Sequence, residues 1–137
     1  MSLKIYIDTN IFLDSVLDRD DGISKEILYF IQDKGFEIVL NDISIINIHY
    51  FARKGLEPKG LKKYINVILD NFTIVSADKL FLKQAINSDF KDFEDAVQYF
   101  CAKSIDADLI ITNDKKGFKN STIDTITSKD FYNSYIN

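Results

Sequence analysis

Several residue types that mark particular functions are scarce in this chain. Its one cysteine, Cys101, excludes a disulfide within the chain, and such a protein is expected in a reducing cytoplasm. His49 is the single histidine, so the sequence offers no cluster of imidazoles and thiolates for a zinc ion. A packed or surface position is the simpler interpretation of His49, and a core position that of Cys101. Neither a Walker A pattern nor a G-x-G-x-x-G loop occurs, which excludes both of these phosphate-binding motifs.

Long apolar segments and an excess of positive charge are also missing. No run approaches the roughly 18–20 apolar residues of a membrane-spanning helix, and residues 1–6 lack the layout of a signal peptide, so no membrane association is expected. With 17 basic and 21 acidic residues the net charge is −4, and no overall positive field attracts nucleic acid. The 137-residue length and the 46% hydrophobic composition are typical of one globular domain, which we expect to span residues 1–137.

Apolar residues follow strand-like and helix-like spacing in alternation. Strands are predicted at residues 3–7, 36–40, 72–75 and 109–112, with a weaker one near 123–127. Helices are predicted at residues 11–17, 24–34, 43–51, 61–69, 78–87 and 92–106, with a last one from Ser128. Residues 55–59 are predicted as a turn. This alternation predicts an α/β fold of three layers, α/β/α, around a central and mainly parallel sheet.

Two aspartates follow predicted strands closely. Asp8 comes directly after strand 3–7, and Asp114 lies two residues beyond strand 109–112. Open parallel sheets bind ligands at the carboxyl ends of their strands, so both side chains are expected at one binding edge. Either aspartate alone is also explained as a turn residue or helix cap, and Asp8 would suit the helix that follows it. The small polar residues that accompany these aspartates are Thr9, Asn10, Thr112 and Asn113.

A third acidic group stands at the start of predicted helix 92–106, where Asp92, Glu94 and Asp95 occupy three of four positions. Asp95 lies nearly opposite the centre of the predicted core face, toward solvent or a solvated cleft. The helix dipole alone favours acidic residues in a first turn. Together with the strand-end aspartates, however, these carboxylates suit a hard divalent cation such as Mg²⁺ or Mn²⁺, which prefers oxygen ligands. The predicted core face comprises Phe93, Ala96, Val97, Phe100, Cys101 and Ser104.

Three segments of the chain, in order, resemble those of PIN domains. Residues 5–13, I-Y-I-D-T-N-I-F-L, resemble the family's opening strand followed by D-T-N. Residues 92–99, D-F-E-D-A-V-Q-Y, resemble the D-F-E-D-A-x-Q-Y segment of one bacterial branch. Residues 107–114, A-D-L-I-I-T-N-D, with Phe118 after them, resemble the closing strand, T-x-D and phenylalanine. The resemblance extends over nearly the whole chain.

This resemblance implies a parallel sheet between helices and Mg²⁺- or Mn²⁺-dependent hydrolysis of phosphodiesters, usually in RNA. Many bacterial members are VapC-type toxins, held inactive by a small antitoxin and commonly dimeric, so an antitoxin and a homodimer are expected partners beside the RNA substrate. Carried over by position, Asp8, Asp95 and Asp114 are the metal-site carboxylates and catalytic residues. The resemblance also implies that Asn10 and Thr112 support this site and that Asp92 and Glu94 are its acidic neighbours.

One position departs from the family pattern. A glutamate is usual in the helix after the second strand, and Asn47 occupies its place within residues 44–50. Asparagine offers a carbonyl oxygen to a cation, but it brings no negative charge and cannot act as a general base. Glu94 or Asp92 is the candidate to compensate, so Asn47 and Glu94 join the three aspartates as candidate catalytic residues. Without such compensation, the chain is instead a PIN-fold binding module for RNA or an antitoxin.

Basic side chains offer two places for RNA phosphates. Lys115, Lys116 and Lys119 follow Asp114 closely and are expected to bind phosphates that flank the cleaved one. A second group places five basic residues within positions 53–63, and a solvated face of two helices explains it more simply than an RNA-binding patch. That group comprises Arg53, Lys54, Lys59, Lys62 and Lys63.

A phosphatase of haloacid-dehalogenase type is a further alternative, because it too opens with an aspartate after its first strand. That chemistry needs a second aspartate two residues later, and Asn10 stands there. The metal-dependent ribonuclease is therefore the favoured prediction.

Overall fold

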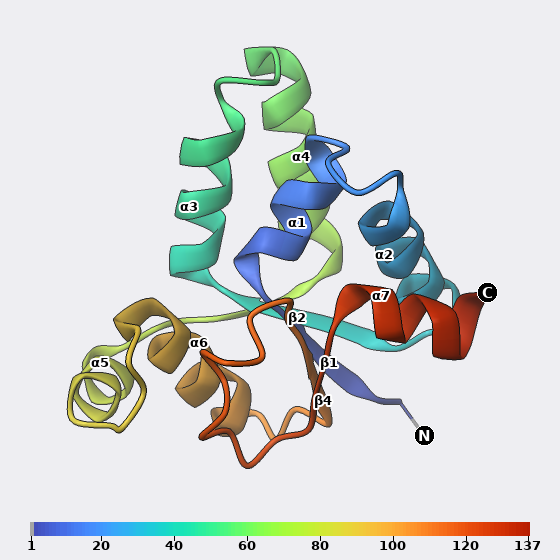
Figure 1. Cartoon of the computed structure of the whole chain (residues 1–137). Helices are drawn as coiled ribbons and strands as arrows, with labels where there is room; N and C mark the ends of the chain where they lie inside the picture. The colour runs from blue at the N-terminus through green and yellow to red at the C-terminus, as the bar shows by residue number, and fades with distance from the viewer. Residues whose placement is uncertain (1) are drawn as a thin grey trace.

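The computed structural model describes residues 2–137 and places a parallel sheet at the centre of the molecule (Figure 1). Within these residues the strand order is β3-β2-β1-β4-β5, and every neighbouring pair runs parallel. The predicted parallel sheet is confirmed. Its strands are β1 (Lys4–Ile7), β2 (Glu37–Asn41), β3 (Thr73–Val75), β4 (Leu109–Ile111) and β5 (Thr125–Ile126).

Helices cover both faces of this sheet and complete the predicted three-layer α/β/α architecture. On one face lie α1 to α4 together with α7 and η1, and on the other lie α5 and α6 (Figure 1). None of the helices in residues 2–137 is both long and apolar enough to cross a bilayer. The helices are α1 (Thr9–Val16), α2 (Ile23–Asp33), α3 (Asp42–Ala52), α4 (Pro58–Asn71), α5 (Lys79–Ile86), α6 (Phe93–Ser104), α7 (Ser128–Phe131) and the π-helical turn η1 (Tyr132–Ile136).

The strands separate two hydrophobic cores because successive side chains of a strand point to opposite faces. In β1, Ile5 and Ile7 enter the core beneath α1 to α4, whereas Tyr6 enters the core beneath α5 and α6. Ile111 and Ile110 of β4 divide between the two cores in the same way. A strand covered on both sides carries apolar residues without polar alternation, as β4 does.

Two local predictions are wrong. The turn predicted at residues 55–59 ends early, since α4 begins at Pro58, in the first helical turn where proline's missing N–H costs no hydrogen bond. On α6, Phe93 and Ser104 do not join the core: Phe93 is 47% exposed, and Ser104 is also exposed. The buried surface of α6 instead extends around the helix to Asp95 and Gln98, so a single apolar stripe does not describe it.

The strand order reverses around β1. The chain runs from β1 outward to β2 and β3 and then returns to β4 on the other side of β1. In open parallel sheets, ligands bind at such a reversal, beyond the carboxyl ends of the strands. The residues that follow β1 and β4 therefore occupy the place where this fold is best suited to bind a ligand.

Candidate metal centre

Asp8 is fixed at the carboxyl end of β1 by three hydrogen bonds. Thr112 Oγ1 donates to Asp8 Oδ2 at 2.7 Å, and Gln98 Nε2 donates to Asp8 Oδ1 at 3.3 Å. The Asn10 N–H also donates to Oδ1 at 3.3 Å, so Asp8 caps α1 as well. Burial, which leaves Asp8 4% exposed, raises the pKa of its carboxyl; the three donors lower that pKa, and the charge of Asp114 raises it. A helix cap and a position at the binding edge are thus compatible in one residue.

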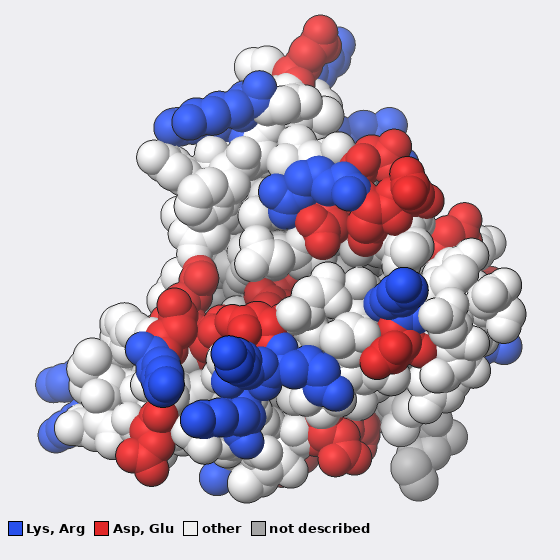
Figure 2. Space-filling model, in the orientation of Figure 1, with Lys and Arg blue, Asp and Glu red and all other residues white. Residues whose placement is uncertain are grey.

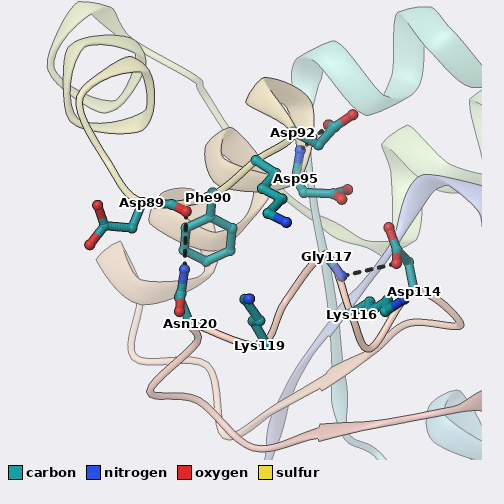
Figure 3. A pocket seen from close by; sticks show the side chains of 10 residues that line it. Asp89, Phe90, Asp92, Asp95, Asp114, Lys116, Gly117, Lys119 and Asn120 are labelled. Atoms are coloured by element: carbon teal, nitrogen blue, oxygen red, sulfur yellow. Dashed lines mark hydrogen bonds between the residues drawn. The ribbon is translucent and has the colours of Figure 1, made fainter.

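Asp114 lies on the loop after β4 and is oriented by that loop. Its N–H donates to Thr112 Oγ1 at 3.0 Å, and its Oδ1 accepts from the Gly117 N–H at 2.9 Å. The Thr112 hydroxyl thereby bonds to Asp8 and Asp114 together. A Cβ atom on Gly117 would collide with the carboxylates of both Asp114 and Asp95. Glycine at this position therefore allows the two carboxylates to approach each other (Figure 3).

Asp95 projects from the first turn of α6 into the same space. Its N–H donates at 2.9 Å to Oδ1 of Asp92, which caps the helix, and the residue is only 8% exposed. Burial, the charges of Asp8 and Asp92, and the hydrogen bond and charge of Asp114 raise the pKa of Asp95 to about 8. At neutral pH the carboxyl therefore retains a proton when no cation is nearby. Asp95 was predicted to face either solvent or a solvated cleft, and in the structure it lines a cleft.

A buried polar network behind Asp8 joins three helices. Thr9 Oγ1 and Ser44 Oγ are 2.7 Å apart, and Gln98 Oε1 accepts from the Thr9 N–H at 3.3 Å and from Ser44 Oγ at 3.5 Å. Gln98 is 1% exposed, and its Nε2 donates to Asp8 while its Oε1 accepts from Thr9 and Ser44. Thr9, predicted to support the site, lies in this network, together with Gln98 and Ser44, which were not predicted. Gln98 lies within residues 92–99, which resemble a PIN-domain segment, and Ser44 begins residues 44–50, where the family usually has a glutamate. These segments were the available signal.

Asn47 and Glu94 contact each other across the site. Asn47 Nδ2 of α3 donates to Glu94 Oε2 of α6, so the residue in place of the expected glutamate holds a carboxylate from the neighbouring helix. Burial raises the pKa of Glu94, the Asn47 hydrogen bond lowers it, and the charges of Asp8 and Asp92 raise it. Glu94 therefore lies within the electrostatic reach of the aspartates.

Two other predicted supporting residues are placed differently. Asn10 is exposed, and its contact with Asp8 is made by its backbone N–H. Asn113 Oδ1 accepts from the N–H and Oγ of Ser128 at 2.9 and 3.0 Å. The prediction for Asn113 is therefore corrected: its side-chain oxygen holds Ser128, the first residue of α7, and within residues 2–137 it forms no hydrogen bond with the carboxylates.

A pocket of about 250 Å³ opens beside Asp95 and Asp114, between the loop before α6 and the loop after β4 (Figure 3). Of the three lysines predicted to bind flanking phosphates, Lys116 and Lys119 line it, whereas Lys115 does not. Figure 2 shows basic side chains gathered beside acidic ones on this face. Lys91 lines the pocket too, and sequence reasoning missed it because its loop is distant along the chain from Asp114.

The second basic group lies elsewhere. Arg53 lines a separate hollow of about 480 Å³ between α3 and α4 and stacks 4.1 Å above the ring of Tyr50. Lys54 follows it beyond the C-terminal end of α3. These residues do not share the pocket of the carboxylates.

The acidic residues fit a divalent cation chemically. Within residues 2–137, no three Asp, Glu, His or Cys side chains are already arranged as a closed metal-binding group. Burial is nevertheless the main cause that raises the pKa of Asp95, and the nearby charge of Asp8 and the hydrogen bond and charge of Asp114 raise it further. All the donors are carboxylate oxygens, the ligands that Mg²⁺ and Mn²⁺ prefer. A cation bound here would relieve the repulsion between the carboxylates. When no cation is bound, the proton on Asp95 relieves that repulsion.

Comparison with known proteins finds a family match over most of the chain. A family model described as a PIN domain matches residues 4–116, a span that contains all three aspartates. The ribonuclease VapC1 of Aquifex aeolicus (strain VF5) is 26% identical over 137 residues, which cover 95% of this chain and 94% of the relative.

Solved structures resemble the fold at lower identity. The VapBC2 structure from Rickettsia felis, bound to a promoter DNA fragment, has a TM-score of 0.67 at 14% identity, covering 91% of this chain and 98% of that one. A toxin–antitoxin complex from Klebsiella pneumoniae has a TM-score of 0.67 at 18% identity, covering 90% and 97%. The DNA-bound VapBC structure from Salmonella typhimurium has a TM-score of 0.66 at 15% identity, covering 92% and 98%.

Proposed function

We infer the function from one premise: the chain belongs to the PIN domain family. It is also distantly related to a VapC ribonuclease. We propose that it is a Mg²⁺- or Mn²⁺-dependent endoribonuclease whose site is built on Asp8, Asp95 and Asp114. The observation that carries this proposal is the gathering of these three carboxylates, from β1, α6 and the loop after β4, where the strand order reverses.

The residues of this chain set the geometry of the proposed reaction. Thr112 and Gln98 orient Asp8, and the Gly117 N–H orients Asp114, so the carboxylates are fixed before substrate arrives. A bound divalent cation supplies a Lewis acid that neutralises charge on the phosphate and promotes in-line attack by water. Glu94, held by the Asn47 amide, adds the negative charge that asparagine does not bring.

Replacing Asp8 tests this proposal directly. Asp8→Asn is expected to abolish Mn²⁺-dependent cleavage of single-stranded RNA, because the amide removes a charge from the site. Folding should be unaffected, since asparagine caps helices as well as aspartate does. Cleavage is followed on denaturing gels, and the melting temperature by circular dichroism.

A matched control for this test is Asp70→Asn, a change at an exposed residue near the end of α4. It is expected to cleave at the wild-type rate. Equal cleavage by Asp8→Asn and Asp70→Asn would refute the assignment of the site.

Asn47 also favours a second candidate function, that of a PIN-fold binding module without catalysis. Titration calorimetry with Mn²⁺ separates the two functions. The ribonuclease requires ion binding by the natural protein, with tighter binding by Asn47→Glu because a carboxylate is added. No heat from the natural protein at millimolar metal, together with binding by Asn47→Glu, would favour the binding module.

We further propose that the chain is the toxin of a toxin–antitoxin pair. Support comes from the VapC relative and from the structural neighbours, several of which are complexes of a toxin with its antitoxin. Growth arrest on expression, relieved by Asp8→Asn and by coexpression of a neighbouring reading frame, is the result this proposal requires. A homodimer remains a prediction of the resemblance.

A further inference from the structure

The pocket beside Asp95 and Asp114 carries features that metal binding does not use. Three lysines, an aromatic ring and an amide line it in addition to the acidic residues. We propose that this pocket binds the nucleotide adjacent to the scissile phosphate of single-stranded RNA, with its phosphate on the lysines and its base against Phe90. This inference rests on the proposed ribonuclease function and names the contacts that its substrate makes in the pocket.

The three lysines carry positive charges that are not neutralised by ion pairs within residues 2–137. Lys91, Lys116 and Lys119 are all exposed, and none forms an ion pair within residues 2–137, where the recorded pair is Arg19 with Asp14. They come from two loops, Lys91 before α6 and the other two after β4, and line one pocket. In a chain of net charge −4, such a local concentration of free cations beside a carboxylate site suits a polyanion that reaches that site.

The two loops that form the pocket are fastened to each other. Asn120 Nδ2 donates to the Asp89 carbonyl at 3.1 Å (Figure 3). The Tyr99 hydroxyl of α6 and the Thr122 hydroxyl of the later loop are 2.8 Å apart. The rings of Phe90 and Phe118 meet edge to face at 6.1 Å. The loops that carry the lysines are therefore held in place before RNA binds, so less conformational entropy is lost on binding.

Phe90 gives the pocket an apolar surface for a base. Its ring stacks on Tyr99 at a centroid distance of 5.0 Å and is half-buried, so it is supported from behind while it lines the pocket. Aromatic rings on which bases stack, combined with a basic groove along the backbone, are how proteins bind single strands without reading their sequence. Figure 3 shows Phe90 and Lys119 bordering the same hollow.

A single strand fits this recess better than a duplex does. The pocket lies between two loops, and a base must leave its stack to reach a ring inside it. The paired bases of an RNA duplex keep their faces covered, so a duplex would bring phosphates to the lysines but no base to Phe90. We therefore expect duplex RNA to bind more weakly than a single strand of the same sequence.

Binding measured without cleavage tests the inference. The probe is a labelled single-stranded RNA of roughly ten nucleotides, titrated by fluorescence anisotropy with Ca²⁺ in place of Mn²⁺. Gels run after each titration verify that the RNA is intact. Each lysine–phosphate contact contributes about 0.7 to the slope of log Kd against log salt, which is roughly an eightfold gain in affinity at about 0.05 M relative to 1 M salt.

The variants Lys91→Gln, Lys116→Gln and Lys119→Gln are each expected to lose the roughly eightfold gain in RNA affinity at low salt. Each is also expected to lower the salt slope by about 0.7. Lys115→Gln is the matched control, because Lys115 is exposed in the same loop but does not line the pocket. Phe90→Leu is expected to weaken binding without changing the salt slope, since it removes a ring and no charge.

The inference is overturned if Lys115→Gln weakens binding as much as the pocket lysines do, if duplex RNA binds equally well, or if the wild type binds no RNA. Cleavage in Mn²⁺ is scored separately. Wild-type cleavage with unchanged binding by all three lysine variants would overturn the inference and leave the ribonuclease in place. Lysine-dependent binding without cleavage would overturn the ribonuclease and uphold the pocket.

Discussion

Gly117 has no side chain at the point where Asp95 and Asp114 come together, and its N–H orients Asp114. Gly117→Ala is therefore expected to push the two carboxylates apart and to lower the cleavage rate by roughly a hundredfold, the cost of a misplacement of about 1 Å. The control is Gly60→Ala in α4, where an added Cβ meets Leu56 at an ordinary 3.6 Å and should stabilise the helix by about 1 kcal/mol. Cleavage rates and melting temperatures of both variants check this, and full activity in Gly117→Ala would contradict it.

At the scale of elements, periodicity predicted the strands and most helices because each is a local pattern of apolar residues. The sheet edge with Asp8 and Asp114 followed from the same pattern, since carboxyl ends of parallel strands meet. The burial of Gln98 was not predictable this way, because it depends on α1, α3 and α6 meeting at one point. The contribution of Lys91 likewise depends on two loops that are distant in sequence.

A polar side chain near a strand end can also serve a neighbouring element. Asn113 resembles Thr112 in sequence position, yet one side chain bonds to Asp8 and the other to Ser128 of α7. Adjacent residues leaving a strand point in different directions, and composition does not tell which one faces the site. For the same reason, Asp95 required the resemblance before the fold placed it in the cleft.

For the whole molecule, the clustered carboxylates couple folding to pH. Folding raises the pKa of Asp95 from 3.8 to about 8, so the folded chain holds a proton that the unfolded chain releases. The corresponding stability is fully present below about pH 4 and is lost as pH rises toward 8. The melting temperature of Asp95→Asn minus that of the wild type, both without metal, should therefore increase from pH 5 to pH 8.

Mg²⁺ should reverse this loss, because a cation replaces the proton and binds the folded state. The rise in wild-type melting temperature on adding Mg²⁺ is expected to be larger at pH 8 than at pH 5. If the melting-temperature difference between Asp95→Asn and the wild type, both without metal, does not change with pH, then protonation of Asp95 is not coupled to folding.

The contact between Asn47 and Glu94 also constrains how this sequence can change over evolutionary time. A return to glutamate at position 47 alone would set two carboxylates against each other, and loss of Glu94 alone would leave an amide without its acceptor. Either substitution alone therefore removes this contact, so the two positions are expected to change together among descendants of this gene.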